Sequence, residues 1–164
     1  MLTLDDTRHA GNAMPYKIPV STLVLVYTRD LSVLLIERAD APEYWQSVTG
    51  SQEPGESLLE TATRELREET GIEAGSVGQI SDWHVSNVYE IYSRWRHRYP
   101  PGTTHNTEHV FGLELAQSVP VQLNPREHLA HQWLPYAAAA AKCFSWSNRD
   151  AILLLPERIA RRVK

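Results

Sequence analysis

The sequence predicts an α/β protein, an α/β/α sandwich in which a mixed β-sheet lies between helical layers. Runs rich in β-branched and aromatic residues, the composition of strands, occur on both sides of one well-delimited helical segment. Further helical segments follow the last of these runs. Strands that precede and follow helices in this way are typical of a sheet covered on both faces.

The length of the chain fits one domain. Its 164 residues are 42% hydrophobic and 22% charged, which is enough apolar material for a core without disulfides or structural metals. We expect a flexible N-terminal arm over residues 1–15 and a single domain over residues 16–164.

The first strands are expected in residues 18–28 and 31–37. A short polar break, Arg29-Asp30, separates these two apolar runs, and together they predict a hairpin that enters the sheet. Residues 38–50 contain Pro42 and are expected to be irregular, delivering the chain to Gly50.

A helix is expected after residue 57. Ser57 and Glu60 have the S-x-x-E spacing of a capping box, and Gly71 supplies the C-terminal stop. Apolar residues recur at helical spacing within it, and four of them are expected to face the sheet: Leu58, Leu59, Ala62 and Leu66.

The second half of the chain predicts more strands and a helical end. Strand-like runs lie near residues 77–80, 85–92, 107–115 and 131–134, and a polar, proline-containing loop occupies residues 94–108. Residues 137–142 predict a short helix. Ser147 with Asp150 predicts the cap of a C-terminal helix that Pro156 interrupts or kinks.

Residues 50–72, GSQEPGESLLETATRELREETGI, contain a motif whose spacing is G-x5-E-x7-R-E-U-x-E-E-x-G-U, where U is apolar. At ordinary composition such a coincidence has a probability on the order of 10⁻⁷ in a chain of this length. Four carboxylates in one loop and one helix repel each other unless a positive charge lies among them. The motif therefore indicates a site for a divalent metal that carries phosphates.

The helical part of the motif brings its carboxylates together. Glu65, Glu68 and Glu69 are three and four residues apart, so their side chains emerge from adjacent turns and can converge on one ion cluster. A merely solvated acidic helix end is the weaker interpretation, because carboxylates at a helix C-terminus oppose the macrodipole. Oxygen ligands without a His or Cys cluster favour Mg²⁺ or Mn²⁺ over zinc. Such an ion assists attack of water on a phosphoanhydride.

This motif resembles the box of the Nudix hydrolase family. The resemblance implies that Glu65, Glu68 and Glu69 bind the metal, with the backbone carbonyl of Gly50 as a further ligand. Arg64 is then expected to pair with a carboxylate and hold the helix against the loop. An exposed helical pair between Arg64 and a glutamate one turn away is the other interpretation.

Segments outside the box indicate which branch of the family the sequence resembles. EYWQSVTGS, RWRHRYPPGTTHNTEHVF, REHLAHQWL, SWSNRDAI and the K-x-P-V-S entry at residues 17–21 resemble the dihydroneopterin triphosphate pyrophosphatase branch of the family. This implies hydrolysis of dihydroneopterin triphosphate to the monophosphate and pyrophosphate, in folate biosynthesis. A housecleaning pyrophosphatase for nucleotides such as dATP is the first alternative. A Nudix-fold module that binds a ligand without hydrolysis is the second.

The same branch resemblance assigns residues beyond the box. Glu127 is expected to join the metal site and to act as general base, and Lys17 and Arg38 to contact phosphates. The other expected substrate contacts are Thr49, Tyr89, Glu90, Ile91, Tyr92 and Ser145, with Glu127 shared between substrate and metal. A helix-entry cap is the local alternative for Ser145.

Two aromatic and basic features keep both interpretations open. Trp45 is either a stacking partner for the ring or a core anchor. The basic cluster of the 94–108 loop either guides a polyanion to the site or forms a solvated face: Arg94, Arg96, His97 and Arg98.

Bulk charge and cysteine content exclude several partner classes. Lys plus Arg total 16 against 20 Asp plus Glu, a net charge of -4, so no global basic field holds nucleic acid or an anionic membrane. The single cysteine, Cys143, forms no internal disulfide, and no apolar run reaches the roughly 20 residues that span a bilayer. We expect a cytoplasmic enzyme with a small-molecule triphosphate substrate, Mg²⁺ or Mn²⁺ as cofactor, and no obligate protein partner.

Overall fold

The computed structural model describes residues 15–162, and residues 1–14 of the expected N-terminal arm lie outside them. The strands are β1 (Val20–Thr28), β2 (Ser32–Arg38), β3 (Trp45–Gln46), β4 (Val48–Ser51), β5 (Ile80–Glu90), β6 (His105–Leu115) and β7 (His128–Pro135). The helices are α1 (Leu58–Thr70), the 3₁₀ helix η1 (Ser93–Arg98), α2 (Tyr136–Lys142), α3 (Trp146–Leu153) and α4 (Leu155–Arg162).

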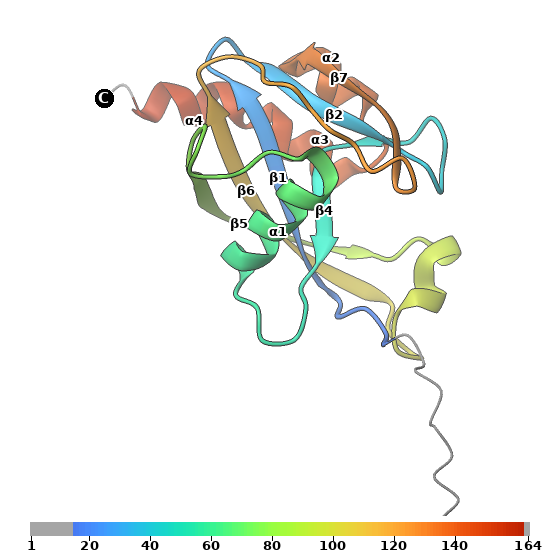
Figure 1. The fold of residues 1–164 in the computed structure, drawn as a ribbon. Helices are drawn as coiled ribbons and strands as arrows, with labels where there is room; N and C mark the ends of the chain where they lie inside the picture. The colour runs from blue at the N-terminus through green and yellow to red at the C-terminus, as the bar shows by residue number, and fades with distance from the viewer. Residues whose placement is uncertain (1–14, 163–164) are drawn as a thin grey trace, which may run out of the picture.

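The strands form one mixed sheet, as the sequence predicts. Its order is β3-β2-β1-β6-β5, with β7 paired to β2 (Figure 1). β6 runs parallel to β1 over the whole length of β1, whereas the other pairs are antiparallel. β4 pairs with the first half of β1, and β2 pairs near its end. β1 therefore changes neighbours along its length on one side.

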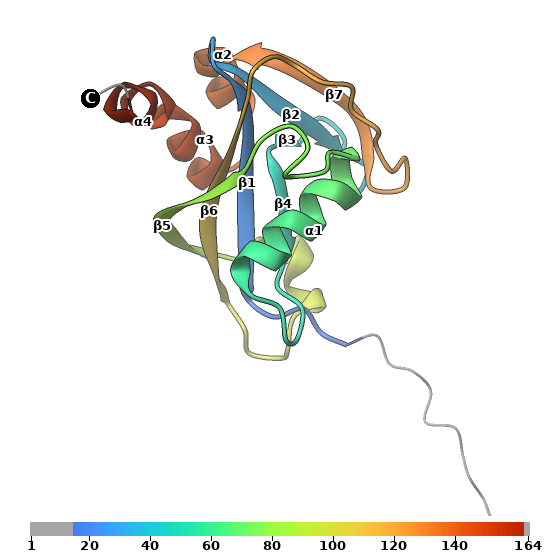
Figure 2. The same ribbon diagram turned by 60° about the vertical axis from the view of Figure 1, so that its left-hand side comes forward.

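Helices cover both faces of this sheet (Figure 2). α1 packs on one face, where Val24, Val26, Leu66, Phe111 and Leu113 form a buried cluster. α2, α3 and α4 cover the opposite face over a second cluster that contains Leu23, Leu25, Tyr27, Val110 and Ile152. Alternate residues of β1 thus enter different cores, because successive side chains of a strand point to opposite faces.

The structure confirms the predicted helix ends and corrects one buried position. Ser57 accepts a hydrogen bond from the backbone of Glu60, whose side chain caps Ser57 in return, and Gly71 ends α1 in the left-handed region at φ 72°. The prediction that Leu59 faces the sheet was wrong, because its side chain is 50% exposed. Periodicity shows which residues share a helix face, but not that the first turn lies largely outside the core.

Other corrections concern short elements. Residues 38–50 are not irregular throughout, because they contain β3 and the start of β4. The strand expected at 77–80 begins only at Ile80, and the 94–108 loop contains most of η1 and the start of β6. The side chain of Ser145, rather than Ser147, caps α3, and Ser147 is buried inside the helix. The expected break near Pro156 separates α3 from α4. Residues 15–162 contain no helix long and apolar enough to cross a membrane.

Candidate active site: a carboxylate cavity beside an aromatic pocket

A cavity lies where the end of α1 meets β4. We call it the carboxylate cavity because Glu53, Glu65, Glu68, Glu69 and Glu127 all line it. Four of these residues come from the loop and helix of the 50–72 motif, and Glu127 comes from the loop before β7. The fold therefore brings Glu127 to the motif across 58 residues of sequence, counted from Glu69.

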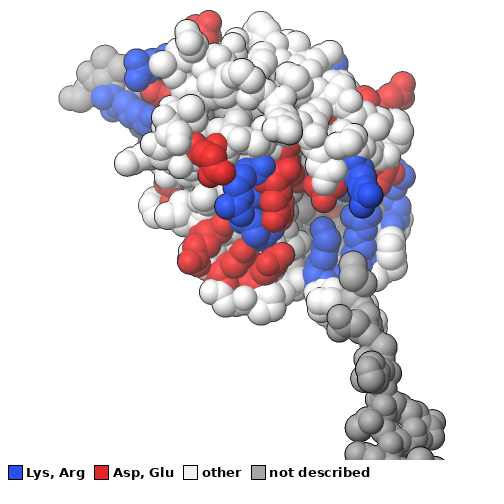
Figure 3. Space-filling model, viewed as in Figure 1, with Lys and Arg blue, Asp and Glu red and all other residues white. Residues whose placement is uncertain are grey.

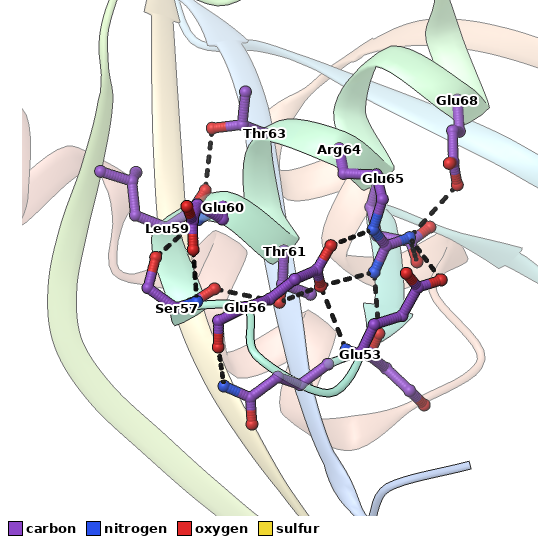
Figure 4. Close-up of polar contacts among 12 residues, drawn as sticks. Glu53, Glu56, Ser57, Leu59, Glu60, Thr61, Thr63, Arg64, Glu65 and Glu68 are labelled. Carbon is purple, nitrogen blue, oxygen red and sulfur yellow. Dashed lines mark hydrogen bonds and ion pairs between the residues drawn. The ribbon is translucent and has the colours of Figure 1, made fainter. Parts of the chain in front are cut away.

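Arg64 holds the loop and the helix of the motif together (Figure 4). Its Nε donates to Glu56 Oε1 at 2.6 Å, and its guanidinium also contacts Glu65 at 2.7 Å and Glu68 at 3.2 Å. It also donates to the backbone carbonyl of Ser51 at 3.1 Å. The Arg64 hydrogen bond holds the pKa of Glu56 near 2, well below its usual range. Arg64 thus fixes the geometry of the cavity wall, beyond a simple surface pair along the helix.

Gly50 permits the closest approach between β4 and α1. A Cβ atom built on Gly50 would overlap the carboxylate of Glu65. Only a residue without a side chain leaves room for this carboxylate to lie against the strand backbone. The glycine at the start of the motif is therefore required by space, since no left-handed backbone conformation is involved.

Two carboxylates of the cavity are strongly desolvated. Burial raises the pKa of Glu65 to about 7, against the opposing effect of Arg64. Burial and the neighbouring Glu65 raise the pKa of Glu69 well above its usual value, although the backbone N–H of Thr49 donates to its Oε2 at 3.1 Å. A cation placed among these groups would stabilise their charged forms.

The donor set fits a hard divalent cation. The cavity offers carboxylate oxygens and the backbone of Gly50, without cysteine, and the single imidazole in its wall, His128, is buried. Oxygen donors of this kind suit Mg²⁺ or Mn²⁺. Within residues 15–162, no three acidic, His or Cys side chains are yet arranged as a ready ligand set. Arg64 contacts one oxygen each of Glu65 and Glu68, Oε1 and Oε2 respectively, so the second oxygen of each carboxylate stays available to a cation.

A second cavity, the aromatic pocket, adjoins the first and is lined by Tyr89, Tyr92, Trp95, Tyr99 and Phe144. The Phe144 ring lies 5.7 Å from Tyr92 and 5.9 Å from Trp95 between centroids. Behind it, Tyr44 stacks on Phe144 at 4.9 Å. Flat aromatic walls of this kind favour a flat heterocycle.

The inner wall of the aromatic pocket is polar. Asn148 of α3 bonds the backbone and the side chain of Ser47 at 2.7 and 2.9 Å, which ties the helix to the strand region. On the sheet, Asn106 donates to Ser21 at 2.8 Å and to the Tyr89 hydroxyl at 3.0 Å. Burial raises the pKa of Tyr89, so this hydroxyl stays neutral. These bonds fix the wall before any ligand enters.

Cations lie at the junction of the two cavities. Lys17, Arg38 and Arg98 line both of them. Asp40 orients two of the three, since it accepts from Arg38 at 2.7 Å and from Arg98 at 3.0 Å. The surface in Figure 3 shows basic side chains gathered beside a group of acidic ones on this face of the molecule. A ligand with a ring at one end and phosphates at the other matches this order of walls.

Strand β4 separates the two regions with alternate residues. Ser47 bonds Asn148 of α3 just before β4, and Ser51 lines the aromatic pocket. Val48 packs in the α1 core, and Gly50 lies against Glu65 of α1. Ser51 thus faces the aromatic pocket and Val48 faces α1, while Thr49 and Gly50 between them border both cavities.

Most of the substrate contacts expected from the sequence line these cavities. Lys17, Arg38 and Thr49 lie at the junction, and four more line the aromatic pocket: Tyr89, Ile91, Tyr92 and Ser145. Glu90 is the exception, because its side chain pairs with Arg96 and lines neither cavity. Ser145 also caps α3 through its side chain, so the helix-cap interpretation is confirmed and its contact with the substrate stays a prediction.

The structure shows where Trp45 and the basic cluster of residues 94–98 lie. Trp45 is 9% exposed, packs in the core and carries Lys142 over its ring at 4.3 Å, so it is an anchor and not a wall of the pocket. Of the basic cluster, Arg98 reaches both cavities, whereas Arg94 covers Tyr44 at 5.6 Å.

Sequence reasoning assigned no site role to several residues of the aromatic pocket, among them Trp95, Phe144 and Glu108. Trp95 lies in η1 and Phe144 in the loop before α3, and the two rings meet each other and Tyr44 across long stretches of sequence. The signal that could have found Glu108 is a carboxylate inside the strand 107–115, where charged residues are rarely buried without a function.

Comparisons with known proteins identify the family that this chain matches. Residues 17–155 match the NUDIX domain family. The chain is 46% identical over 139 residues to the dihydroneopterin triphosphate diphosphatase of Escherichia coli K12, covering 84% of this chain and 91% of that protein. It is 37% identical over 142 residues to the Haemophilus influenzae protein of the same name, covering 85% and 88%. The solved structure of the E. coli dihydroneopterin triphosphate pyrophosphohydrolase matches with a TM-score of 0.78, covering 84% of this chain and 94% of that one.

Proposed function

The chain belongs to the NUDIX domain family of hydrolases, and from this premise we propose that it hydrolyses dihydroneopterin triphosphate. The products are dihydroneopterin monophosphate and pyrophosphate. Relatives that carry this activity in their names are similar over 84 to 85% of the chain. The proposed reaction is a step of folate biosynthesis.

One observation carries this proposal: the same three cations line both the aromatic pocket and the carboxylate cavity. A triphosphate held by Lys17, Arg38 and Arg98 would place its ring on the aromatic side and its anhydride bonds on the carboxylate side. Local cations are needed for such a ligand, because the net charge of the protein is -4. Burial and Arg98 lower the pKa of Lys17, and a phosphate bound beside this side chain would favour its charged form.

Glu65, Glu68, Glu69 and Glu127, with the backbone carbonyl of Gly50, would hold Mg²⁺ or, in its place, Mn²⁺. When bound, such an ion would supply a positive charge that polarises a phosphoryl oxygen of the substrate and lowers the pKa of a coordinated water molecule. Glu127 is proposed to orient and deprotonate the attacking water, since it lines the same cavity from a separate loop. Arg64 holds α1 against the β4 loop through Ser51 and Glu56, so it positions the ligands.

The ring is proposed to lie between the aromatic side chains, in contact with Tyr89, Ile91 and Tyr92. Thr49 and Ser145 border the same pocket. We place the enzyme in the cytoplasm, because its lone cysteine, Cys143, has no second cysteine in the chain to form an internal disulfide. Its partner is a small-molecule triphosphate, and the proposal needs no nucleic acid, membrane or second protein.

The test is the product and the substrate preference. Purified protein with Mg²⁺ should release pyrophosphate, and not successive phosphates, from dihydroneopterin triphosphate. Its kcat/KM for this compound should exceed that for dATP and every common nucleoside triphosphate. A higher kcat/KM for dATP would make it a nucleotide pyrophosphatase, and binding without turnover would make it a ligand-binding module.

A further inference from the structure

Glu108 is a carboxylate at the inner end of the aromatic pocket. It lies in β6, between Ser21 of β1 and Asn87 of β5, and its neighbour two residues along, Val110, faces the core under α3. The side chain of Glu108 is therefore on the same sheet face as Ser21, which also lines the pocket. The residue is 4% exposed, so its charge is removed from bulk water.

The hydrogen bonding of Glu108 is incomplete. Its Oε1 is buried without a hydrogen-bond partner, and no ion pair involves it within residues 15–162. The Ser147 hydroxyl is the one side chain that favours its charged form against burial. A buried acceptor left without a donor is costly. Glu69, the other buried glutamate of the site, differs because it accepts from a backbone N–H.

The position of Glu108 relative to the three cations determines which part of a bound ligand would contact its carboxylate. Lys17, Arg38 and Arg98 mark the phosphate end of the pocket, whereas Glu108 lines only the aromatic pocket and not the carboxylate cavity. In a pterin, the phosphate-bearing side chain and the 2-amino and N3–H donors are at opposite ends of the ring. A ring whose phosphates lie at the junction would therefore present its two N–H donors to the inner end.

We propose that Glu108 recognises the N–H edge of the substrate ring, accepting hydrogen bonds from the 2-amino group and the adjacent ring N–H. This inference rests on the proposed function and adds the residue that selects the heterocycle. A carboxylate has the two acceptors that an adjacent pair of donors requires. Rings whose edge presents oxygen or nitrogen acceptors at the same place are repelled by it. Guanine shares the donor pair and adenine lacks it.

A purely structural role is the competing explanation. Glu108 would then serve only to hold Ser147 and the start of α3. That role predicts that substitution of Glu108 lowers the stability of the protein and weakens the binding of the ring and of the phosphates equally. Recognition of the ring predicts a loss confined to the ring end, so the two explanations separate in one set of measurements.

The experiment compares Glu108→Gln with a matched control, Glu114→Gln, on the same strand. Glu114 pairs with Arg29 and Arg162 at the surface and lines neither cavity. Binding of neopterin, which has the ring without phosphates, should weaken at least about tenfold in Glu108→Gln, because the amide N–H₂ faces ring donors. Inhibition by pyrophosphate and the unfolding temperature should match those of Glu114→Gln.

A substrate pair tests the edge directly. GTP and ITP differ only in the 2-amino group, so the wild-type ratio of kcat/KM between them should be at least about tenfold and should fall towards one in Glu108→Gln. If Glu108→Gln does not fold, Glu108→Asp serves instead, and it should keep the sign of the GTP preference with weaker neopterin binding.

Each result decides one statement. Unchanged neopterin binding and an unchanged GTP/ITP ratio in Glu108→Gln overturn the inference, whether or not dihydroneopterin triphosphate is the substrate. Equal losses for neopterin and pyrophosphate overturn it in favour of the structural role. If the wild type leaves dihydroneopterin triphosphate intact but the ratio falls in the variant, the proposed function fails and the role of Glu108 stands.

Discussion

The carboxylate cavity and the aromatic pocket share a border but are built in different ways. Most acidic residues of the cavity come from 17 positions, Glu53 to Glu69, within one loop and one helix. The aromatic pocket draws its lining from β1, β5, η1, β6 and the start of α3. Most of the proposed metal ligands are therefore encoded locally, whereas the proposed ring pocket depends on how distant elements pack. Changes in each region should alter different measured quantities.

Glu69→Gln should give the largest effect and sharpen the contrast between the regions. We expect kcat to fall at least about a hundredfold, because an amide is a poor ligand for a hard cation. Neopterin should bind as it does to the wild type. The exposed Glu73→Gln is the control in the same Mg²⁺-dependent assay. An unchanged kcat in Glu69→Gln would show that Glu69 is not an essential ligand.

Gly50→Ala should lower activity through a steric effect on the carboxylate cavity, without removing a carboxylate. The added Cβ atom overlaps the Glu65 carboxylate, so this side chain must move away from the strand. We expect kcat to fall about thirtyfold, in line with a ligand displaced from its position. Titration of the metal requirement should show a higher Mg²⁺ concentration at half-maximal activity. Full activity at wild-type Mg²⁺ concentrations would mean that Glu65 need not lie against Gly50.

Phe144→Leu should affect the aromatic pocket and spare the reaction. Loss of this ring removes a stacking wall, which we expect to raise KM for dihydroneopterin triphosphate about tenfold with kcat nearly unchanged. Trp146→Leu removes a neighbouring aromatic that is 43% exposed and does not line the pocket, so it should leave KM unchanged. A fall in kcat with constant KM would contradict the separation of the two regions.

Glu56→Gln should give the smallest effect, and this effect on the unfolding temperature should depend on pH. The pKa of Glu56 is lowered to about 2 by Arg64, so its stabilising effect is complete above about pH 4.5 and is lost as the pH falls towards 2. We expect the variant to unfold about 3 °C below the wild type at pH 7. At pH 3 this gap should narrow to less than half. A gap independent of pH would exclude the charged pair as its cause.

The sequence predicts the carboxylate cavity better than the aromatic pocket, and the reason is physical. Capping residues and spacing act within one helix, so the ends of α1 and the gathering of Glu65, Glu68 and Glu69 on it follow from local rules. Leu59 shows the limit of those rules, since its burial depends on where the sheet ends. Local patterns therefore describe an element, but not the extent of its contact.

The aromatic pocket could not be assembled from the sequence because its contacts are long-range. Phe144 reaches it through a backbone bond to Trp45 at 3.2 Å, across 99 positions. Trp45 itself turns into the core, which composition cannot distinguish from a wall. The branch resemblance supplied Lys17 and Arg38, whereas the local signal for Glu108 was only a carboxylate inside a predicted strand.

The alternation along β4 has a consequence for how this site tolerates change in sequence length. Substitutions at residues facing the aromatic pocket alter the ring wall and leave the neighbouring Gly50 against Glu65. Insertion or deletion of one residue before Gly50 would exchange the two faces and turn a side chain towards Glu65. Point substitutions at these residues of β4 can therefore change the substrate preference of the site. Insertion or deletion of a single residue would instead abolish the proposed hydrolysis.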